Sequence, residues 1–242
     1  MKITILTLFP SMFEGFLKNS IIARAVANEK IEFECVDFRE YATDKFHRVD
    51  DTPCGGGAGM VLQCQPIVDC LKDVRMPNSK VVMLTPSGRV FNQKVAREYA
   101  KDEHLILLCG HYEGFDHRIL NYVDEELSIG DFVLTGGEIA AMVVSDAVIR
   151  LQEGVIRTES SNDDSFENDL LEYPQYTRPI VYDGHEVPSV LLSGHHENIR
   201  KWRLEKSLET TLEKRPDLLQ NRQFTKEELK MLQNIKKNKG IK

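Results

Sequence analysis

The stretch SIGDFVLTGGE at residues 128–138 sets three glycines around a short apolar run and then begins a segment that reads as helical. Glycine adopts backbone conformations that other residues resist, and it lets a ligand approach the main chain closely. Glycines at this density beside a strand predict the wall of a binding site. What binds there has to be inferred from the rest of the chain.

Strand-like and helix-like segments alternate on the N-terminal side of this stretch. Helices that separate short apolar strands favour an α/β fold with a mainly parallel sheet. The first helix begins with the capping-box spacing of Ser11 and Glu14, which predicts that these side chains satisfy free amides at its start. Strands are expected at 2–9, 31–38, 81–84 and 104–109, and helices at about 11–27 and 92–100.

Turn-forming residues follow each of the later strands, at 85–88, 109–114 and 128–138. Ligands of open α/β sheets bind beyond the carboxyl ends of the strands, so these three loops are expected to converge on one site. The helix predicted at 138–151 is apolar on most faces, which indicates burial in a core or in a subunit interface.

The C-terminal part of the chain has a different character. Residues 158–168 are polar and acidic, which is typical of a linker or a mobile loop. Asp183 and Gly184 predict a hairpin turn, and the chain beyond Ser193 reads as helical, with a second capping box at 225–228.

Charge is divided unevenly along the chain, whose net charge is −7. Residues 175–242 hold 14 Lys and Arg and 9 Asp and Glu, which gives a net charge of +5. The residues before them hold the remaining 17 Lys and Arg and 29 Asp and Glu, which gives a net charge of −12. A basic portion after an acidic one can mark a unit that binds a polyanion. A lysine-rich tail without a partner gives the same excess.

The bulk properties place the protein among cytoplasmic globular proteins. The 242 residues contain no apolar run near the roughly 20 residues that span a bilayer, and the start MKITILTLFP is too short for a signal peptide. The five cysteines are odd in number and never spaced as CxxC, which argues against a disulfide framework or a zinc site. Buried thiols are the simpler expectation.

The glycine cluster at 55–60 fails as a dinucleotide motif, because Met60 stands where the third glycine of GxGxxG belongs, and no P-loop pattern occurs anywhere. Two interpretations of the cluster stay open: a loop that lies against a ligand or nucleic acid, and a flexible connector. His195 and His196 are neighbours, and neighbours on a helix point about 100° apart, which argues against their chelating a metal together.

Three cations and the only tryptophan are interleaved at residues 200–203. This mixture suits phosphate contacts and base stacking, although a solvated helix face is an equal alternative. Arg150 stands four residues after Asp146, so a helix-surface ion pair and an arginine directed at an anion are both open. Asp164 lies in the polar segment, where a solvated acidic loop is the default interpretation.

Several long motifs together resemble one family, the bacterial tRNA (guanine-N1)-methyltransferases of the SPOUT class. The resemblance extends over almost the whole chain, with one departure at His111, where other members can carry arginine. The motifs are CGHYEG at 109–114, SIGDFVLTGGE at 128–138, DSF at 164–166, YPQYTRP at 173–179, SGHHENIRKWR at 193–203, LFP at 8–10 and GGGAGM at 55–60.

The resemblance implies an architecture that periodicity does not reveal. The strands and loops after about residue 80 would form a deep trefoil knot, a rare exception to the rule that chains do not thread themselves. The implied parts are a knotted domain that binds S-adenosylmethionine at 1–157, a flexible linker at 158–174 and a smaller helical tRNA-binding domain at 175–242. A homodimer is also implied, with each site shared between the knot of one subunit and the C-terminal domain of the other.

The resemblance also assigns site residues. Those expected around S-adenosylmethionine are Leu84, Thr85, Pro86, Gly110, Glu113, Ser128, Ile129, Gly130, Asp131, Phe132, Val133, Leu134, Gly136 and Gly137. Those expected on RNA are Gly55, Gly56, Gly57, His195, Arg200, Lys201 and Arg203. Magnesium is a second cofactor implied for the family, but the sequence offers no set of carboxylates that we would assign to it.

Methylation of guanine at N1 requires a base, because N1 carries a proton, and removal of that proton builds negative charge on O6. The resemblance places Asp164 as that base and Arg150 as the group that stabilises the charge, on the guanosine next to the anticodon. A linker that orders when tRNA binds would complete the site as a lid. The alternatives are a methyltransferase for another RNA, a non-catalytic RNA-binding protein and, less favoured, a small-molecule enzyme.

Overall fold

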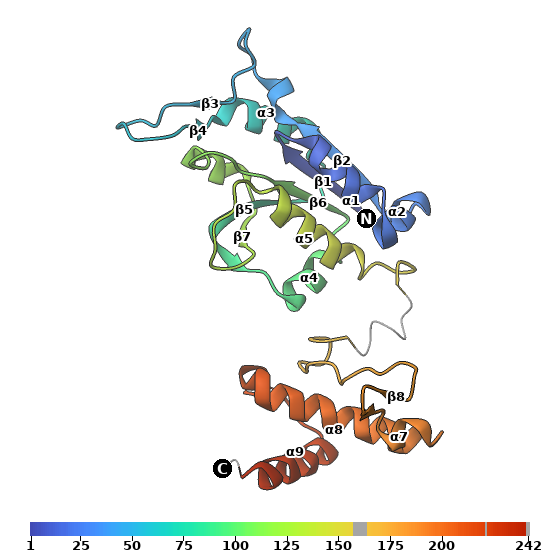
Figure 1. Ribbon diagram of the computed structural model, residues 1–242. Helices are drawn as coiled ribbons and strands as arrows, with labels where there is room; N and C mark the ends of the chain where they lie inside the picture. Colours follow the sequence, from blue (N-terminus) through green and yellow to red (C-terminus); the bar gives the residue numbers. More distant parts are fainter. Residues whose placement is uncertain (157–163, 221, 241–242) are drawn as a thin grey trace. The chain divides into compact units, whose positions relative to one another are not determined.

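The chain divides into two compact units, Met1–Arg157 and Thr158–Lys242. The structure is a computed structural model that describes residues 1–156, 164–220 and 222–240 (Figure 1). No helix in these ranges combines the length and the apolarity needed to cross a membrane.

A five-stranded sheet forms the centre of the first unit, in the order β2-β1-β6-β5-β7. Every pairing in this sheet is parallel, which confirms the predicted α/β class with a mainly parallel sheet. Its strands are β1 (Lys2–Thr7), β2 (Glu32–Asp37), β5 (Ser79–Val90), β6 (His104–Leu108) and β7 (Glu125–Ser128).

Both faces of the sheet are covered, which explains why the central strands read as continuous apolar runs. In β6, Leu105 and Leu107 belong to one core cluster, while Ile106 and Leu108 belong to a second. Residues of α2, α4 and α5 join the first cluster, and residues of α3, η2 and η3 join the second. The bounds are η2 (Phe38–Tyr41), α2 (Ser20–Ala27), α3 (Cys64–Val74), α4 (Gln93–Tyr99), η3 (His117–Tyr122) and α5 (Glu138–Ile149).

The helix expected over residues 11–27 is broken into η1 (Pro10–Phe13), α1 (Glu14–Leu17) and α2. Its predicted capping box at Ser11 is wrong, because Phe9 occupies the N-cap position and Ser11 lies inside the first turn. Pro10 accounts for the shift, since its fixed φ angle suits the first helical position and starts the turn one residue earlier.

Strand β5 is longer than the predicted strand at 81–84, and the expected turn lies inside it as an irregularity. Leu84 and Arg89 are both in register with Leu127 of β7, so the residues between them loop out of the ladder. A Cβ atom on Gly88 would overlap the main chain of Leu127. This close approach requires glycine at that position.

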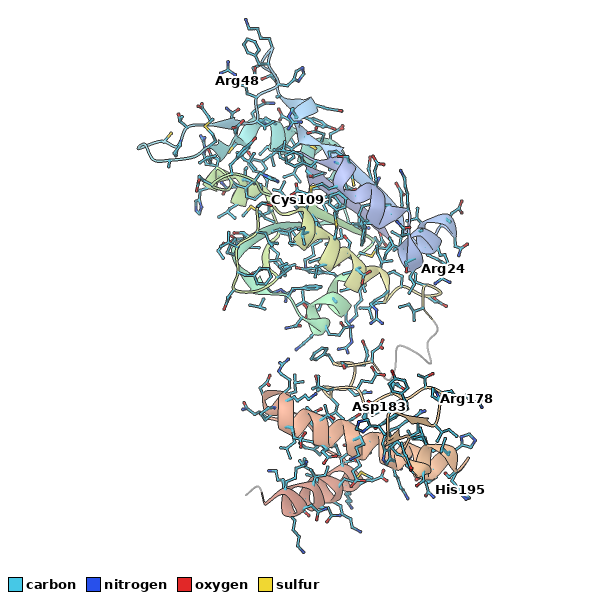
Figure 2. All side chains as sticks on the ribbon, viewed as in Figure 1. Arg24, Arg48, Cys109, Arg178, Asp183 and His195 are labelled. Carbon is cyan, nitrogen blue, oxygen red and sulfur yellow. The ribbon has the colours of Figure 1, made fainter. Side chains whose placement is uncertain are left out.

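A short hairpin, β3 (Asp50–Asp51) with β4 (Val61–Leu62), carries the glycine cluster of residues 55–60 between its strands. Arg48, just before β3, lies at an outer end of the first unit, whereas Cys109 lies in its interior (Figure 2). Burial of the thiols holds for Cys70 and Cys109, but Cys54, which precedes the glycines, is exposed.

The second unit consists of a small hairpin and a set of helices. The predicted turn at Asp183 and Gly184 is confirmed, because it joins β8 (Val181–Tyr182) to β9 (His185–Glu186). The capping box of Thr225 and Glu228 is confirmed at the start of α9. The helices are α7 (Ser189–Leu192), α8 (His196–Lys214), η4 (Pro216–Leu219) and α9 (Lys226–Lys239).

Candidate functional site: two pockets

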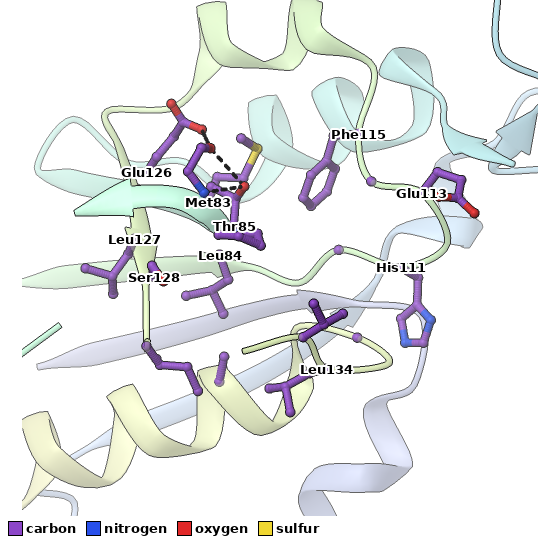
Figure 3. A pocket seen from close by; sticks show the side chains of 18 of the residues that line it. Met83, Leu84, Thr85, His111, Glu113, Phe115, Glu126, Leu127, Ser128 and Leu134 are labelled. Carbon is purple, nitrogen blue, oxygen red and sulfur yellow. Dashed lines mark hydrogen bonds between the residues drawn. The ribbon is translucent and has the colours of Figure 1, made fainter. Parts of the chain in front are cut away.

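The first unit has a pocket of about 650 Å³ at the carboxyl ends of β6 and β7 and at the irregular part of β5 (Figure 3). The three segments that line it are those in which turn-forming residues were recognised. Of the residues predicted around a cofactor, all but Asp131 and Gly137 line this pocket. The structure therefore brings together loops that are separated by up to about fifty residues of sequence.

Glycines let the loop of residues 128–138 pack directly on the loop after β6. The Gly137 amide donates to the Gly110 carbonyl oxygen at 2.9 Å, and a Cβ atom on Gly137 would lie 2.7 Å from the Cα atom of Cys109. Gly130 has a φ angle of +141°, which is unfavourable for other residues. Gly137 thus shapes the pocket from behind without lining it.

A buried carboxylate that the sequence analysis missed joins this loop to β1. Glu138 is 1 % exposed; it accepts a hydrogen bond from the Thr7 hydroxyl at 2.7 Å, and its other oxygen lies 3.1 Å from His111 Nε2. The His111 ring in turn contacts Phe9, with 4.8 Å between ring centroids. A glutamate directly after two glycines at a helix start was the available signal, and it was interpreted only as a helix beginning.

The polar groups at the pocket rim come from the turn of β5 and from β7. Ser87 donates to Glu126 at 2.6 Å and lies 3.0 Å from the Thr85 hydroxyl (Figure 3). Beneath the pocket, burial raises the pKa of the Cys109 thiol well above its usual value, so this thiol stays protonated and is no nucleophile. Cys109 therefore offers no nucleophile to this pocket, whereas Thr85, Ser87 and Glu126 offer hydrogen-bonding groups.

Arg150 and the glycines expected on RNA also belong to the first unit. Arg150 is half-buried at the C-cap of α5, where its amide donates to the Asp146 carbonyl at 3.1 Å. Gly55, Gly56 and Gly57 all have positive φ angles, and a Cβ atom on either of the first two would point into open space. Their backbone conformation, rather than tight packing, accounts for glycine there.

The second unit has a pocket of its own, of about 590 Å³, and Asp164 lines it. Arg200 and Arg203 of α8 line the same pocket, so the structure brings the predicted base close to two residues that were predicted to bind RNA. The Arg203 guanidinium lies 4.8 Å from the ring centroid of Tyr173, another lining residue. Arginine, an aromatic ring and a carboxylate are groups that recognise nucleotides.

Part of the segment expected as a linker is packed onto the second unit. The Leu171 amide donates to the Thr211 hydroxyl at 2.8 Å, and Leu170 is buried in a small core with Leu208 and Ile235. The remainder of the expected linker, up to residue 163, lies outside the described residues.

Ion pairs constrain the cations of α8. Arg200 bonds to Glu197 and Glu227, each at 2.9 Å, and Lys201 lies 3.4 Å from Glu197. The hydrogen bond from Arg200 lowers the pKa of Glu197 to about 2. Two of the cations expected on RNA are thus already neutralised in part, while exposed His195 stands at the N-cap of the helix.

No cluster of three or more His, Cys, Asp or Glu side chains within the described ranges has the arrangement of a metal site. His195 stands at the N-cap of α8, and His196 is the first residue of that helix.

Comparison with known proteins gives a consistent result along the chain. A family model described as "tRNA (Guanine-1)-methyltransferase TrmD" matches residues 1–221. Proteins named "tRNA (guanine-N(1)-)-methyltransferase" are similar to this chain. The one from Clostridium beijerinckii is 55 % identical over 241 residues, and the match covers 99 % of this chain and 100 % of the relative. The relative from Halalkalibacterium halodurans is 54 % identical, and the match covers 98 % of both chains. The relative from Clostridium botulinum strain 657 is also 54 % identical, and the match covers 98 % of this chain and 99 % of the relative. The chain belongs to the tRNA (guanine-1)-methyltransferase TrmD family.

Proposed function

We propose that this protein transfers the methyl group of S-adenosylmethionine to N1 of the guanosine at position 37 of tRNA, next to the anticodon. Membership of the family and the names of its relatives support tRNA guanine methylation. The observation that carries the proposal is the pocket of the first unit, because the loops predicted around the cofactor converge there.

The pocket suits S-adenosylmethionine in size and in chemistry. Its volume of about 650 Å³ lies within the roughly 300–1,000 Å³ of small-molecule sites. Main-chain groups of the loop at 128–136 are available to bind the adenine, and Gly110 and Gly136 place no side chain in the pocket at their own positions. When bound, S-adenosylmethionine supplies a methyl group on a positively charged sulfur.

Asp164 and Arg150 perform the proton and charge chemistry of the proposal. Asp164 takes the proton from guanine N1, which frees the N1 electron pair to form the bond to the methyl carbon. Arg150 stabilises the negative charge that develops on O6. Holding N1 in line with the methyl group supplies much of the remaining acceleration.

The proposal extends to the architecture and the assembly. The first unit would contain the deep trefoil knot, and a homodimer would combine the cofactor pocket of one subunit with Asp164 and the basic helices of the other, in the cytoplasm. Exposed Ile139 and Val143 on α5, 48 % and 45 % exposed, give that helix an apolar outer face suited to a partner subunit.

The tRNA would lie on the second unit and on the glycine hairpin of the first. Arg203 and Tyr173 offer a cation and an aromatic ring to a nucleotide, and Gly55–Gly57 allow close approach of a backbone. No step is assigned to magnesium, because the described residues hold no group of three or more His, Cys, Asp or Glu side chains arranged to bind an ion.

Transfer of labelled methyl from S-adenosylmethionine to tRNA transcripts with guanosine or adenosine at position 37 tests the proposal. We expect methylation of the guanosine transcript alone, and a loss of at least about 100-fold in Asp164→Asn, since general-base catalysis contributes that much or more. Lys72→Gln, which alters an exposed pair with Asp69 on α3 and lies in neither pocket, serves as the control.

Transfer to ribosomal RNA but to neither transcript would overturn the tRNA assignment in favour of another RNA substrate. Cofactor binding without transfer to any RNA would favour a non-catalytic RNA-binding protein. Full activity of Asp164→Asn would remove Asp164 from the mechanism.

A further inference from the structure

We propose that Arg222, held by Glu228, is a positioning residue that fixes the segment carrying Asp164 on the second unit. The Arg222 Nε donates to the main-chain carbonyl oxygen of Asn168 at 2.9 Å, and its Nη2 donates to Glu228 at 2.7 Å. One guanidinium therefore joins the Asp164 segment to the start of α9. The catalytic consequence rests on the proposed role of Asp164 as base.

Glu228 is a firm anchor for this contact. Its second carboxylate oxygen accepts the Thr225 amide at 2.7 Å within the capping box, so both oxygens are engaged. The Arg222 and Glu228 side chains are only 11 % and 9 % exposed. Arg222 lowers the pKa of Glu228 below its usual range. Charge-assisted hydrogen bonds in such surroundings are strong, and removal of one partner leaves the other charge buried and unpaired.

The segment itself has a conformation that needs outside support. Phe166 and Asp169 have positive φ angles of +73° and +55°, which residues other than glycine adopt only where their surroundings hold them. The Phe166 amide donates to the Leu170 carbonyl at 2.8 Å, so the chain turns back on itself between them. Arg222 contacts this turn at Asn168, in its middle.

The turn is also where the site is shaped, because Asp164, Asn168, Arg222 and Glu228 all line the pocket of the second unit. The Glu167 amide donates to the Asp164 carbonyl at 3.2 Å, so movement of the turn is transmitted to the backbone of Asp164. A displaced base loses its alignment with the proton that it removes. Binding of S-adenosylmethionine involves the other unit and should not change.

The test combines methyl transfer with hydrogen–deuterium exchange in the full-length protein. In Arg222→Met, we expect faster deuterium uptake in residues 164–172 and a kcat lower by about 100-fold, the effect of a misplaced catalytic group, with an unchanged KM for S-adenosylmethionine. Arg222→Lys keeps the charge but loses the planar fork, so its kcat should lie between those of Arg222→Met and the unchanged protein. Lys72→Gln should match the unchanged protein in both measurements.

A double variant separates positioning from a general loss of stability. If Arg222 acts through Asp164, Arg222→Met combined with Asp164→Asn should be no slower than Asp164→Asn alone. If Arg222→Met does not fold, Glu228→Gln, which keeps an oxygen for the Thr225 amide, replaces it in both measurements.

The two proposals fail in different ways. Unchanged deuterium uptake in residues 164–172 would overturn the Arg222 contact as a positioning device, whatever the activity. Faster uptake with undiminished, Asp164-dependent transfer would overturn its catalytic consequence. Full activity of Asp164→Asn would overturn both the assignment of Asp164 as the base and the effect of Arg222 on catalysis. Deuterium uptake in residues 164–172 would still decide whether Arg222 fixes the segment.

Discussion

The two pockets of this protein differ in the kinds of residue that form their walls. One wall of the pocket of the first unit, called the main-chain wall below, is the loop at 128–136, which contains Gly130 and Gly136 and lies above a sheet that is buried on both faces. The pocket of the second unit has charged side chains in its wall and lies over a core whose buried members are Leu170, Leu208 and Ile235; the charged residues are Asp164, Arg200, Arg203, Arg222 and Glu228. A wall of main chain is sensitive to added atoms, whereas a wall of charged side chains is sensitive to their removal.

The largest expected effect concerns the small core of the second unit. Leu208→Ala removes a fully buried side chain and should destabilise this unit by about 3 kcal/mol. Hydrogen–deuterium exchange should show loss of protection in α8 and α9. In the matched variant Leu107→Ala, the two large clusters of the first unit should keep β1 protected. Equal loss of protection in both units after either change would break the contrast between the cores.

The next effect concerns the main-chain wall. Gly137→Ala places a Cβ atom 2.7 Å from the Cα atom of Cys109 and should cost about 2 kcal/mol of overpacking, felt as weaker cofactor binding. Isothermal titration with S-adenosylmethionine measures it. Gly15→Ala, where the new atom meets nothing within 4 Å, is the control. Binding that is unchanged in Gly137→Ala would mean that the loop can move aside, and the wall would not be rigid.

The smallest effect is a difference in acid sensitivity. His104 is buried between the hydroxyls of Thr4 and Ser79, at 2.9 and 2.7 Å, and desolvation lowers its pKa. Because the unfolded chain then binds the proton more readily, the first unit should lose stability as pH falls below about 6.5, the usual histidine value.

The second unit has its own acid-sensitive group, Glu228, whose pKa is also lowered, in this case by Arg222. Its contribution should be lost only as pH falls below about 4.3, the usual glutamate value. Urea unfolding followed by hydrogen exchange in each unit at pH 7.5, 5.5 and 4.5 measures the difference. His104→Gln should flatten the response of the first unit; an unflattened response would assign the acid sensitivity to another group.

Much of the first unit could be predicted from sequence, because its strands are short apolar runs followed by turn residues. Strand β6 and the parallel sheet illustrate this well. The extension of β5 to Val90 could not be predicted, since residues 85–88 have turn chemistry and only pairing with β7 makes them part of a strand. The shift of the first helix start has a local cause instead, Pro10.

The sites show the same division between local and long-range information. Glycine-rich loops indicated the first pocket because clusters of glycine and turn residues can be recognised within a short stretch of sequence. Glu138 was missed because its partner Thr7 is 131 residues away, and Arg222 was missed because its acceptor, Asn168, is 54 residues away. Such pairings depend on the folded chain, and single residues in a sequence carry no sign of them.

The main-chain wall of the first pocket has a consequence for inhibitors and resistance. A compound that hydrogen-bonds to backbone groups of residues 128–136 would contact atoms that every amino acid possesses. Substitution of a side chain cannot delete those atoms, and at Gly136 or Gly137 any larger residue overlaps neighbouring atoms of the fold itself. Escape from such a compound would therefore have to come through the side chains that line the rest of the pocket, among them Thr85, His111 and Glu126.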